Sequence, residues 1–127
     1  MFHRVFEFNR IIQQVEYRDQ APLKDKEKQW LLTCLREEAD EFDEALDRVQ
    51  QVDALIDSMI FAAGGLFRMG LTVKQAEDCV NAVMDANFLK KTGQKAGRVF
   101  EGVADATKPE GWAGPELRIS QILGQDS

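Results

Sequence analysis

The chain has 127 residues, of which 44% are hydrophobic and 30% are charged, and its formal net charge is −6. This length and ordinary globular composition fit one domain with a modest core. The acidic balance argues against a protein that coats nucleic acid, because such proteins normally carry a basic surface. The charged start and the lack of a membrane-length apolar run lead us to expect a cytoplasmic protein. Cys34 and Cys79 are too few for a disulfide framework, so we expect reduced thiols.

Helical periodicity dominates the first two thirds of the chain, and no stretch shows the alternation typical of a strand. The pattern predicts a first helix from about Phe2 to Tyr17, before a break at Ala21-Pro22. A second and longest helix is expected from about Lys26 to Leu46, with Asp25 as its N-cap.

Two further helices follow. We expect Arg48 to Gln51 to be a short turn, and the third helix to follow it and end at Gly70. The segment Thr72-Val73-Lys74-Gln75 has the form of a capping box, which predicts the start of a fourth helix that runs to about Lys91.

Glycines and prolines become frequent after Gly93 and argue against a long regular element there. A short helix from about Glu116 to Leu123 is the one element expected in this tail. The fold class predicted is all-α, with a four-helix bundle core over about 2–92 and an irregular tail over about 93–127. We expect one domain over 1–127.

Carboxylates occupy positions where two of these helices should be apolar. The apolar residues of the second helix share one face: Leu31, Leu35, Phe42, Leu46 and Val49. Because each residue turns a helix by about 100°, Glu38 projects near the centre of that face and Glu41 lies at its border. The buried stripe expected on the third helix is Val52, Leu55, Ile56, Met59, Ile60, Ala63 and Phe67. Asp53 and Asp57 lie one turn apart along its edge, so four carboxylates are expected to face a shared interior.

Such a group of carboxylates favours a metal ion. A buried ionised carboxylate must be paired, protonated or bound to a metal, and few basic residues lie nearby in the sequence. Mg²⁺ takes oxygen ligands and keeps waters and phosphate oxygens in its shell. The pairs Glu38/Glu41 and Asp53/Asp57 would hold one or two such ions, polarise a phosphoryl group and lower the pKa of a bound water. The sequence therefore predicts hydrolysis of a phosphoanhydride. Asp40, Asp43, Glu44 and Asp47 are expected to be solvated.

Basic residues gather from the end of the fourth helix onward. On the fourth helix the expected buried stripe is Val73, Ala76, Val80, Val83 and Met84. Asn87 continues this stripe and Lys90 lies at its edge, where an amide and an ammonium would bind a phosphorylated ligand. Further positive charge follows in the sequence, at Lys91, Lys95, Arg98 and Lys108. Arg98 and Lys108 are candidates for reaching phosphates.

Three motifs resemble one known family. They are Glu37-Glu38-Ala39-Asp40-Glu41, the acidic pair ending at Asp57, and Asn-x-x-Lys from Asn87 to Lys90. Together they look like the all-α nucleoside triphosphate pyrophosphohydrolases of MazG type, which are similar in core to helical dUTPases, dCTP pyrophosphatases and phosphoribosyl-ATP pyrophosphohydrolase. The resemblance covers about Leu31 to Lys91, and more weakly the tail Lys108 to Trp112, which looks like tails of phage-type members.

The resemblance implies a set of roles. Glu38, Glu41 and Asp57 would be metal ligands, and Glu37 a further ligand or the base that orients the attacking water. Asn87 and Lys90 would contact the nucleotide. The implied activity is Mg²⁺-dependent cleavage of a nucleoside triphosphate to a monophosphate and pyrophosphate, with Mn²⁺ as a substitute ion. A phosphoribosyl-ATP pyrophosphohydrolase-like enzyme is the alternative activity that the resemblance implies. The family also implies a homodimer or homotetramer, for which Phe2, Phe6 and Phe8 offer apolar surface, and a purpose in clearing unwanted nucleotides.

Several alternatives stay open. The family often has a glutamate three residues before the second aspartate, whereas Ala54 stands there, which makes Asp53 the least certain ligand. Gly64 either leaves room for a ligand or allows close helix packing. Trp30 either stacks on a base or belongs to the core. Trp112 either closes over a ligand or anchors the tail.

Two rival classes compete with this hypothesis. A di-iron carboxylate bundle uses Glu-x-x-His pairs, and His3 is the single histidine of the chain. A non-enzymatic helical module with an acidic docking stripe predicts exposed carboxylates and no metal dependence. The chain also has no Gly-rich phosphate loop of the P-loop type. Neither the preferred base and sugar nor the phosphorus attacked follows from the sequence.

Overall fold

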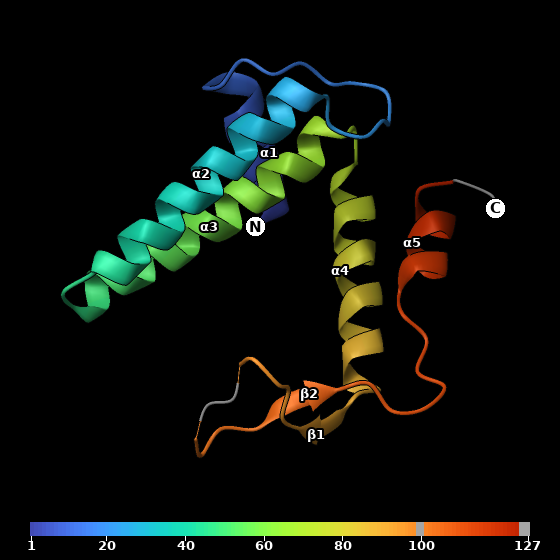
Figure 1. Cartoon of the computed structure of the whole chain (residues 1–127). Helices are drawn as coiled ribbons and strands as arrows, with labels where there is room; N and C mark the ends of the chain where they lie inside the picture. Colours follow the sequence, from blue (N-terminus) through green and yellow to red (C-terminus); the bar gives the residue numbers. More distant parts are fainter. Residues whose placement is uncertain (99–100, 125–127) are drawn as a thin grey trace. The chain divides into compact units, whose positions relative to one another are not determined.

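The computed structural model describes residues 1–98 and 101–124. Its elements, in chain order, are α1 (Phe2–Ile11), α2 (Asp25–Glu44), α3 (Arg48–Arg68), α4 (Val73–Phe88), β1 (Lys91–Gly93), β2 (Asp105–Thr107) and α5 (Glu116–Ile122) (Figure 1). Four main helices and one small hairpin confirm the all-α fold class. The chain divides into two compact units between Ala76 and Glu77.

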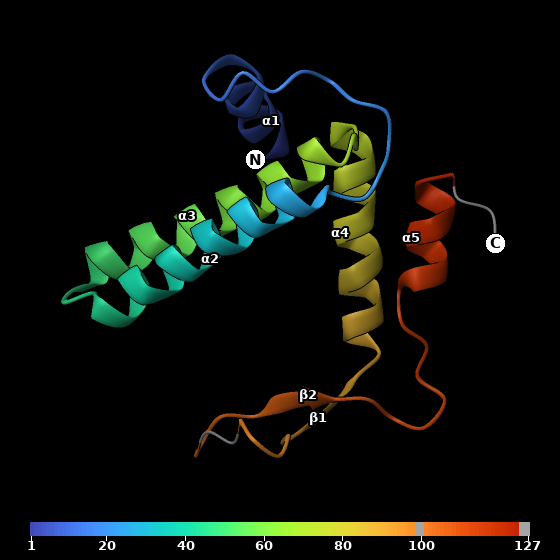
Figure 2. The ribbon, with the colours of Figure 1, turned by 45° about the horizontal axis from the view of Figure 1, so that its top comes forward.

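In the first unit, α2 and α3 run side by side, and α1 packs against α3 (Figures 1 and 2). Gly65 of α3 faces the Leu31 side chain of α2, and a Cβ atom at Gly65 would lie 2.8 Å from Leu31 Cδ2. The buried core of this unit comprises Val5, Phe6, Val15, Ala63, Phe67 and Ala76. Phe67 is only 1% exposed, and its ring lies 5.1 Å from that of Phe6 and 5.2 Å from that of Tyr17. Such tilted aromatic pairs stabilise a core beyond simple burial.

The predictions for the start of the chain are partly wrong. The first helix ends at Ile11 and not at Tyr17, because the chain turns at Gln14, whose φ of 57° is left-handed. The N-cap of α2 is Lys24, which has extended backbone and makes no side-chain capping bond. Asp25 is instead the first residue of the helix, where a carboxylate still interacts favourably with the helix dipole.

The expected turn at Arg48–Gln51 is also wrong, since these residues form the first turn of α3. Asp47 is the N-cap, and its side chain accepts a hydrogen bond of 2.9 Å from the Gln50 backbone N–H. Gln50 Oε1 in turn accepts one of 2.8 Å from the backbone N–H of Leu46. The capping signal at Asp47 marks the true start of the helix.

Helix α4 begins as predicted. Thr72 Oγ1 accepts a hydrogen bond of 3.1 Å from the Gln75 N–H, and Gln75 Oε1 accepts one of 3.0 Å from the Thr72 N–H. This reciprocal pair is the capping box that the sequence indicated. The break before it centres on Gly70, whose φ of 84° is left-handed, as predicted for the end of the third helix. At its other end α4 stops at Phe88 and not at Lys91, which instead begins β1.

The second unit contains a hairpin that the sequence did not predict. β1 and β2 pair antiparallel, with Lys91 opposite Thr107 and Gly93 opposite Asp105. Strands of three residues are too short to show an alternating pattern. Helix α5 confirms the short helix expected from about Glu116, and Arg118 on it forms an ion pair of 2.6 Å with Asp85 of α4. Of the expected tail over about 93–127, residues 99–100 and 125–127 lie outside the described residues.

Large apolar side chains predicted to be buried are exposed in the single chain. Those on or before α3 are Leu46, Val49, Val52, Leu55, Ile56 and Met59, and those on α4 are Val80, Val83 and Met84. Leu46 is 90% exposed, whereas Ala54 on α3 is only 2% exposed. In the first half of α3 the buried residue is therefore the small Ala54, whereas Ala63 and Phe67, nearer the end of the helix, are buried as predicted. Among the described residues no single helix is long and apolar enough to cross a membrane, although α3 and α4 taken as a broken pair meet that criterion by length and composition alone.

Candidate active site

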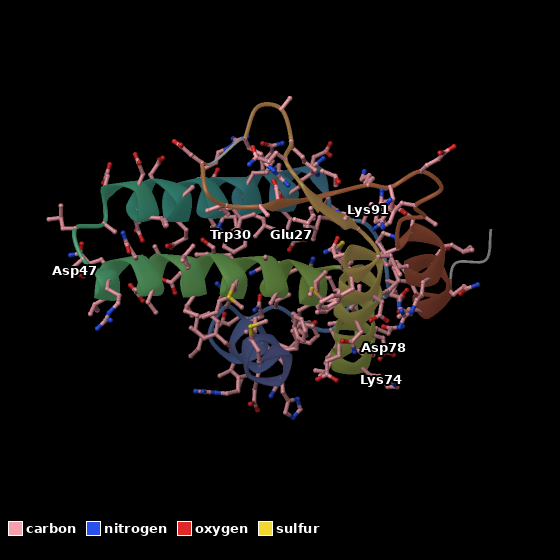
Figure 3. The ribbon with its side chains drawn as sticks, turned by 90° about the horizontal axis from the view of Figure 1, so that it is seen from below. Glu27, Trp30, Asp47, Lys74, Asp78 and Lys91 are labelled. Carbon is pink, nitrogen blue, oxygen red and sulfur yellow. The ribbon has the colours of Figure 1, made fainter. Side chains whose placement is uncertain are left out.

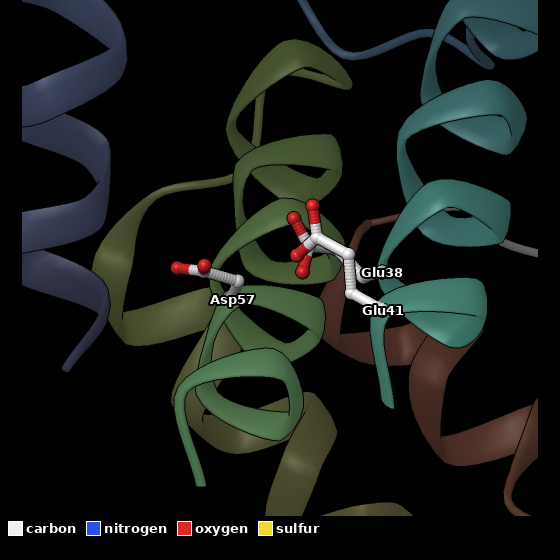
Figure 4. A group of neighbouring side chains, drawn as sticks. All are labelled: Glu38, Glu41 and Asp57. Carbon is white, nitrogen blue, oxygen red and sulfur yellow. The ribbon is translucent and has the colours of Figure 1, made fainter. Parts of the chain in front are cut away.

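Three carboxylates from two helices meet in the first unit. One carboxylate oxygen from each of Glu38, Glu41 and Asp57 lies within 4.8 Å of the others. In Figure 4, Glu38 and Glu41 extend from α2 toward α3, which carries Asp57. Residues three apart on a helix project from neighbouring turns, so the spacing of Glu38 and Glu41 itself places them together. The predicted cluster therefore forms, with three members.

Glu38 is the buried member of this cluster. The residue is 8% exposed, and its Oε2 atom has no hydrogen-bond partner among the described residues. Burial raises the pKa of this carboxyl to about 7, and a hydrogen bond that protonated Glu38 donates to Glu41 and repulsion from Glu41, Asp57 and Asp53 act in the same direction. A buried oxygen without a partner and a disfavoured negative charge would both be relieved by a cation.

Asp53 stands apart from the other three. Its side chain is exposed and it does not belong to the three-carboxylate group, so the expectation that it faces a shared interior is wrong. It lies one turn before Asp57 on α3 but on the more solvated side. Its charge still acts on the site, because burial, Asp53 and Glu41 together raise the pKa of Asp57. Glu41 is likewise exposed, although it remains within the group.

The donor set fits a hard divalent cation. Three carboxylate oxygens on the rigid helices α2 and α3 leave the remaining coordination positions open to waters and phosphate oxygens, as Mg²⁺ prefers. Repulsion within the cluster contributes to the raised pKa of Glu38 and of Asp57, and among the described residues no arginine or lysine pairs with the three carboxylates. The cluster is therefore consistent with divalent-metal binding.

A cavity of about 690 Å³ adjoins the carboxylates within the same unit. Glu38 and Asp57 line one part of it, and the rest is mostly apolar, with Val5, Phe8 and Ile60 among its walls. This volume lies within the range of about 300–1,000 Å³ that is typical of small-molecule sites. A mostly apolar lining that includes two carboxylates suits a ligand that has both a phosphate-bound metal and a flat organic group.

Trp30 and Arg68 also line this cavity. The Arg68 guanidinium sits 4.4 Å from the centroid of the Trp30 ring and donates hydrogen bonds of 3.0 Å to Glu27 and to Gln13. Figure 3 shows Glu27 and Trp30 on the side of α2 that faces α3. Trp30 also packs edge-on against Phe61 at 6.2 Å. Trp30 is 39% exposed and is not among the buried core residues, so its place in the cavity wall leaves the base-stacking role open and does not support the core role.

The remaining predicted residues are on the surface. Glu37 is exposed, and Asn87 is exposed where burial was expected, because α4 buries Ala82 and Ala86 and not the residue that follows. Lys91 lies on β1, and Arg98 forms a two-point ion pair with Asp105, with its Nε atom 2.6 Å from Oδ2. The hydrogen bonds from Arg98 and from the Ala106 N–H lower the pKa of Asp105.

Lys90 and Lys108 share one aromatic partner. Their Nζ atoms lie 5.1 and 5.2 Å from the centroid of the Trp112 ring, within the range of cation–π attraction. Trp112 Nε1 donates a hydrogen bond of 2.8 Å to the Ala86 carbonyl, so this tryptophan anchors the tail to α4. The structure thus favours the anchoring role for Trp112.

The residues that the sequence interpretation missed are polar groups of α1 and α3. Asn9 and Arg68 line the cavity, and Asn9 is 3% exposed. A signal existed for Asn9, which follows Val5 by four residues and therefore shares its buried helical face. A buried amide requires hydrogen-bond partners, so an asparagine on this face could have been identified as a candidate site residue.

Comparison with family models identifies one match, phosphoribosyl-ATP pyrophosphohydrolase, over residues 3–87. The matched segment contains Glu38, Glu41, Asp57 and Asn87, and it ends before Lys90. Comparison with curated proteins and with solved structures gives no match. The family model covers well over half of the chain and agrees with the helical fold and the carboxylate cluster. The chain therefore belongs to the phosphoribosyl-ATP pyrophosphohydrolase family, within the all-α NTP pyrophosphatase (MazG-like) superfamily, and is a hydrolase that acts on phosphoanhydride bonds.

Proposed function

We propose that this enzyme is a Mg²⁺-dependent nucleotide pyrophosphohydrolase that releases pyrophosphate, with phosphoribosyl-ATP as its substrate. The carboxylate cluster of Glu38, Glu41 and Asp57 carries the proposal, because its unpaired charges lie beside a cavity of nucleotide size. The family match favours phosphoribosyl-ATP over simple nucleoside triphosphates. Mn²⁺, which accepts the same oxygen ligands, would substitute for Mg²⁺.

A general nucleoside triphosphate pyrophosphohydrolase that clears unwanted nucleotides is the second candidate. It is supported by the tail from Lys108 to Trp112, which lies outside the family match and resembles tails of phage-type enzymes. The two candidates share the reaction and differ in the group that the base carries.

The proposed reaction places each carboxylate in a role. Glu38, Glu41 and Asp57 would hold the metal, which when bound supplies charge stabilisation for the phosphoryl oxygens and a more acidic water. Glu37, one residue before Glu38 on α2 and exposed, would be a further ligand or would accept the proton of the attacking water. The water oxygen forms a new bond to phosphorus, and the bond from that phosphorus to the oxygen bridging the α- and β-phosphates breaks. Attack at the α-phosphorus expels pyrophosphate with the electron pair, attack at the β-phosphorus expels the monophosphate, and the products are the same.

Phosphate binding is the role that we propose for the basic residues. The candidates are Asn87, Lys90, Lys91, Arg98 and Lys108. Lys90 and Lys108 support it best, since each has an aromatic contact and no carboxylate partner among the ion pairs of the described residues. Arg98 is already paired with Asp105.

One domain over 1–127 and a cytoplasmic location stay predictions.

A homodimer or homotetramer is the proposed assembly, with no nucleic acid polymer and no membrane as partner. The exposed apolar residues of α3, which include Val52, Leu55 and Met59 at 49–54% exposure, would be covered by another copy. Sedimentation analysis of the wild type and of a Leu55→Glu variant tests this, since an added charge on a covered face should shift the protein toward the monomer.

The function is tested with a substrate panel. The protein is incubated with phosphoribosyl-ATP and with ribo- and deoxyribonucleoside triphosphates, with Mg²⁺ or Mn²⁺ and with EDTA, and pyrophosphate is resolved from orthophosphate. We expect pyrophosphate as the primary product, loss of turnover in EDTA, and the highest kcat/KM for phosphoribosyl-ATP. A higher kcat/KM for a simple triphosphate would favour the second candidate, and orthophosphate as the primary product would exclude both.

A further inference from the structure

Two buried side-chain oxygens in the described part of the chain lack a hydrogen-bond partner, and both belong to residues of the same cavity. They are Glu38 Oε2 and Asn9 Oδ1. A buried polar atom without a partner is costly and calls for an explanation. The metal proposed above accounts for Glu38. It does not account for Asn9, which lies on a different helix.

The orientation of the Asn9 amide is fixed by its own helix. Asn9 Nδ2 donates a hydrogen bond of 2.8 Å to the carbonyl oxygen of Val5. The reverse orientation would set Oδ1 against that carbonyl oxygen, where two acceptors repel each other. The group left over at Asn9 is therefore an acceptor, and the ligand atom that it needs is an N–H or O–H donor.

Gly64 on α3 supplies the space for this amide. A Cβ atom at Gly64 would lie 3.0 Å from Asn9 Nδ2 and 3.1 Å from Asn9 Oδ1, closer than side chains normally approach. Gly64 is inside a helix and has no left-handed φ, so its backbone does not require glycine. Glycine is disfavoured in a helix interior. Its presence here is explained by the position of Asn9, and both residues line the cavity.

The cavity around Asn9 has the chemistry of a pocket for a flat, mostly apolar ring. Its walls include Val5, Phe8 and Ile60, and two of its other polar side chains, Arg68 and Gln13, already bond to each other. The carboxylates Glu38 and Asp57 line the same cavity and define where the metal-bound phosphates would lie. A ring held near Asn9 would thus belong to the same ligand as those phosphates.

We propose that the cavity holds the nucleobase and that Asn9 Oδ1 accepts a hydrogen bond from an amino or imino N–H of that base. This selects bases that carry a donor at that edge, because a base without one would leave Oδ1 unpaired. The inference rests on the proposed function in taking the ligand to be a nucleotide, and it adds a specificity-determining residue on α1.

The test compares two substrates that differ in one donor, ATP and purine riboside triphosphate, which lacks the 6-amino group. For the wild type we expect kcat/KM to favour ATP by about tenfold to a hundredfold, the usual effect of one unpaired buried acceptor. Asn9→Leu removes the acceptor oxygen at similar side-chain volume. Gly64→Ala leaves Asn9 in place but moves its amide, because the added Cβ atom would lie too close to it. In both variants the preference should fall toward one.

Ile60→Val is the matched control, because it alters the same cavity without changing a polar group. It should lower kcat/KM for both substrates by the same factor, and melting curves check that every variant folds. A wild-type preference that persists in Asn9→Leu overturns the proposal, as does a wild type that shows no preference.

The base pocket is also tested without hydrolysis, because the proposed substrate is phosphoribosyl-ATP and turnover of ATP is not required by the proposed function. Calorimetry with adenosine 5′-monophosphate and purine riboside 5′-monophosphate measures base binding without catalysis, whereas failure of the proposed function is a substrate panel in which phosphoribosyl-ATP gives no pyrophosphate. A Kd difference that disappears in Asn9→Leu supports the base pocket in a protein with another activity. Equal Kd values in wild type and variant overturn the pocket as well.

Discussion

The carboxylates of the first unit and the hairpin carboxylate of the second unit have opposite electrostatic surroundings. Glu38 is buried beside other carboxylates, and its pKa is raised to about 7. Asp105 of the hairpin is bonded to Arg98, and its pKa is lowered. A carboxylate that is already paired needs no further partner, whereas a group of unpaired ones requires a proton or a cation. The difference makes the first unit the candidate site for divalent-metal binding.

The two regions also differ in how their side chains are positioned. Glu38, Glu41 and Asp57 project from long helices that the family model covers. Lys91, Arg98 and Lys108 lie on or around a hairpin of three-residue strands beyond the matched segment. We therefore expect substitutions in the first region to abolish chemistry, and substitutions in the second to change binding by smaller factors.

The largest effect is expected from Glu38→Gln. The substitution keeps the shape of the side chain and removes one ligand charge from the metal site, so kcat should fall by more than about a hundredfold. Asp40→Asn is the matched control, since Asp40 is exposed on the same helix and lies outside the cluster. Steady-state kinetics and a melting curve measure both. Equal activity in wild type and Glu38→Gln would contradict the assignment of Glu38 to the metal site.

A comparison of the two aspartates of α3 gives the next largest effect. Asp57 belongs to the three-carboxylate group and Asp53 does not. Asp57→Asn should therefore reduce kcat by roughly a hundredfold, whereas Asp53→Asn should change it less than about tenfold, as expected for a charge that acts from outside the ligand set. The ratio of the two kcat values at saturating Mg²⁺ measures this. A larger loss in Asp53→Asn would place that residue among the ligands.

Smaller effects are expected in the second unit. Lys90→Ala and Lys108→Ala should each raise KM by about threefold to tenfold with little change in kcat, the result expected when uniform binding of phosphates is lost. Arg98→Ala should have less effect, because Arg98 is engaged by Asp105. KM values at low and high salt test the electrostatic origin. A fall in kcat at constant KM would assign these lysines to the chemical step.

The smallest change is a shift in stability with pH. A raised pKa means that folded Glu38 binds its proton more tightly than the unfolded chain does, so its contribution to stability is complete below its ordinary pKa of 4.5 and is lost as the pH rises through about 7. The Tm of the metal-free protein should fall by a few degrees over this window. Glu27, whose pKa is lowered because bonds from Arg18 and Arg68 outweigh its burial, changes only at lower pH.

Calorimetric melting curves in EDTA measure this shift, with Glu38→Gln as the reference. The variant cannot ionise at this position, so its Tm should fall less with rising pH than that of the wild type. Mg²⁺ should raise the wild-type Tm most at the alkaline end, where no proton competes for the carboxylates. A metal-free Tm that rises between these pH values would contradict the raised pKa.

Helix-borne features were the predictable part of this protein. The capping box at Thr72 and Gln75 and the i, i+3 pair of Glu38 and Glu41 follow from local spacing, and the structure has both. The side of Asp53 was not predictable in this way. It depends on how α3 packs in the folded chain, where Ala54 is buried and the neighbouring Asp53 is exposed.

Features that depend on contacts between distant segments were missed. The hairpin joins Lys91 to Thr107 across a long loop, and no local pattern encodes this pairing. The amide of Asn9 gains its meaning only from Gly64, which is far away in the sequence. The expected burial of Asn87 failed because a continued stripe does not show where the packing of a helix ends.

The central claim, that Glu38, Glu41 and Asp57 form the metal site of the enzyme, is tested most directly by titrating Mn²⁺ into the protein and following the free ion by electron paramagnetic resonance. The wild type should bind Mn²⁺ near neutral pH and release it to excess Mg²⁺, Asp40→Asn should bind it equally, and Glu38→Gln should weaken binding by at least about tenfold. Equal Mn²⁺ affinity in wild type and Glu38→Gln would contradict the claim.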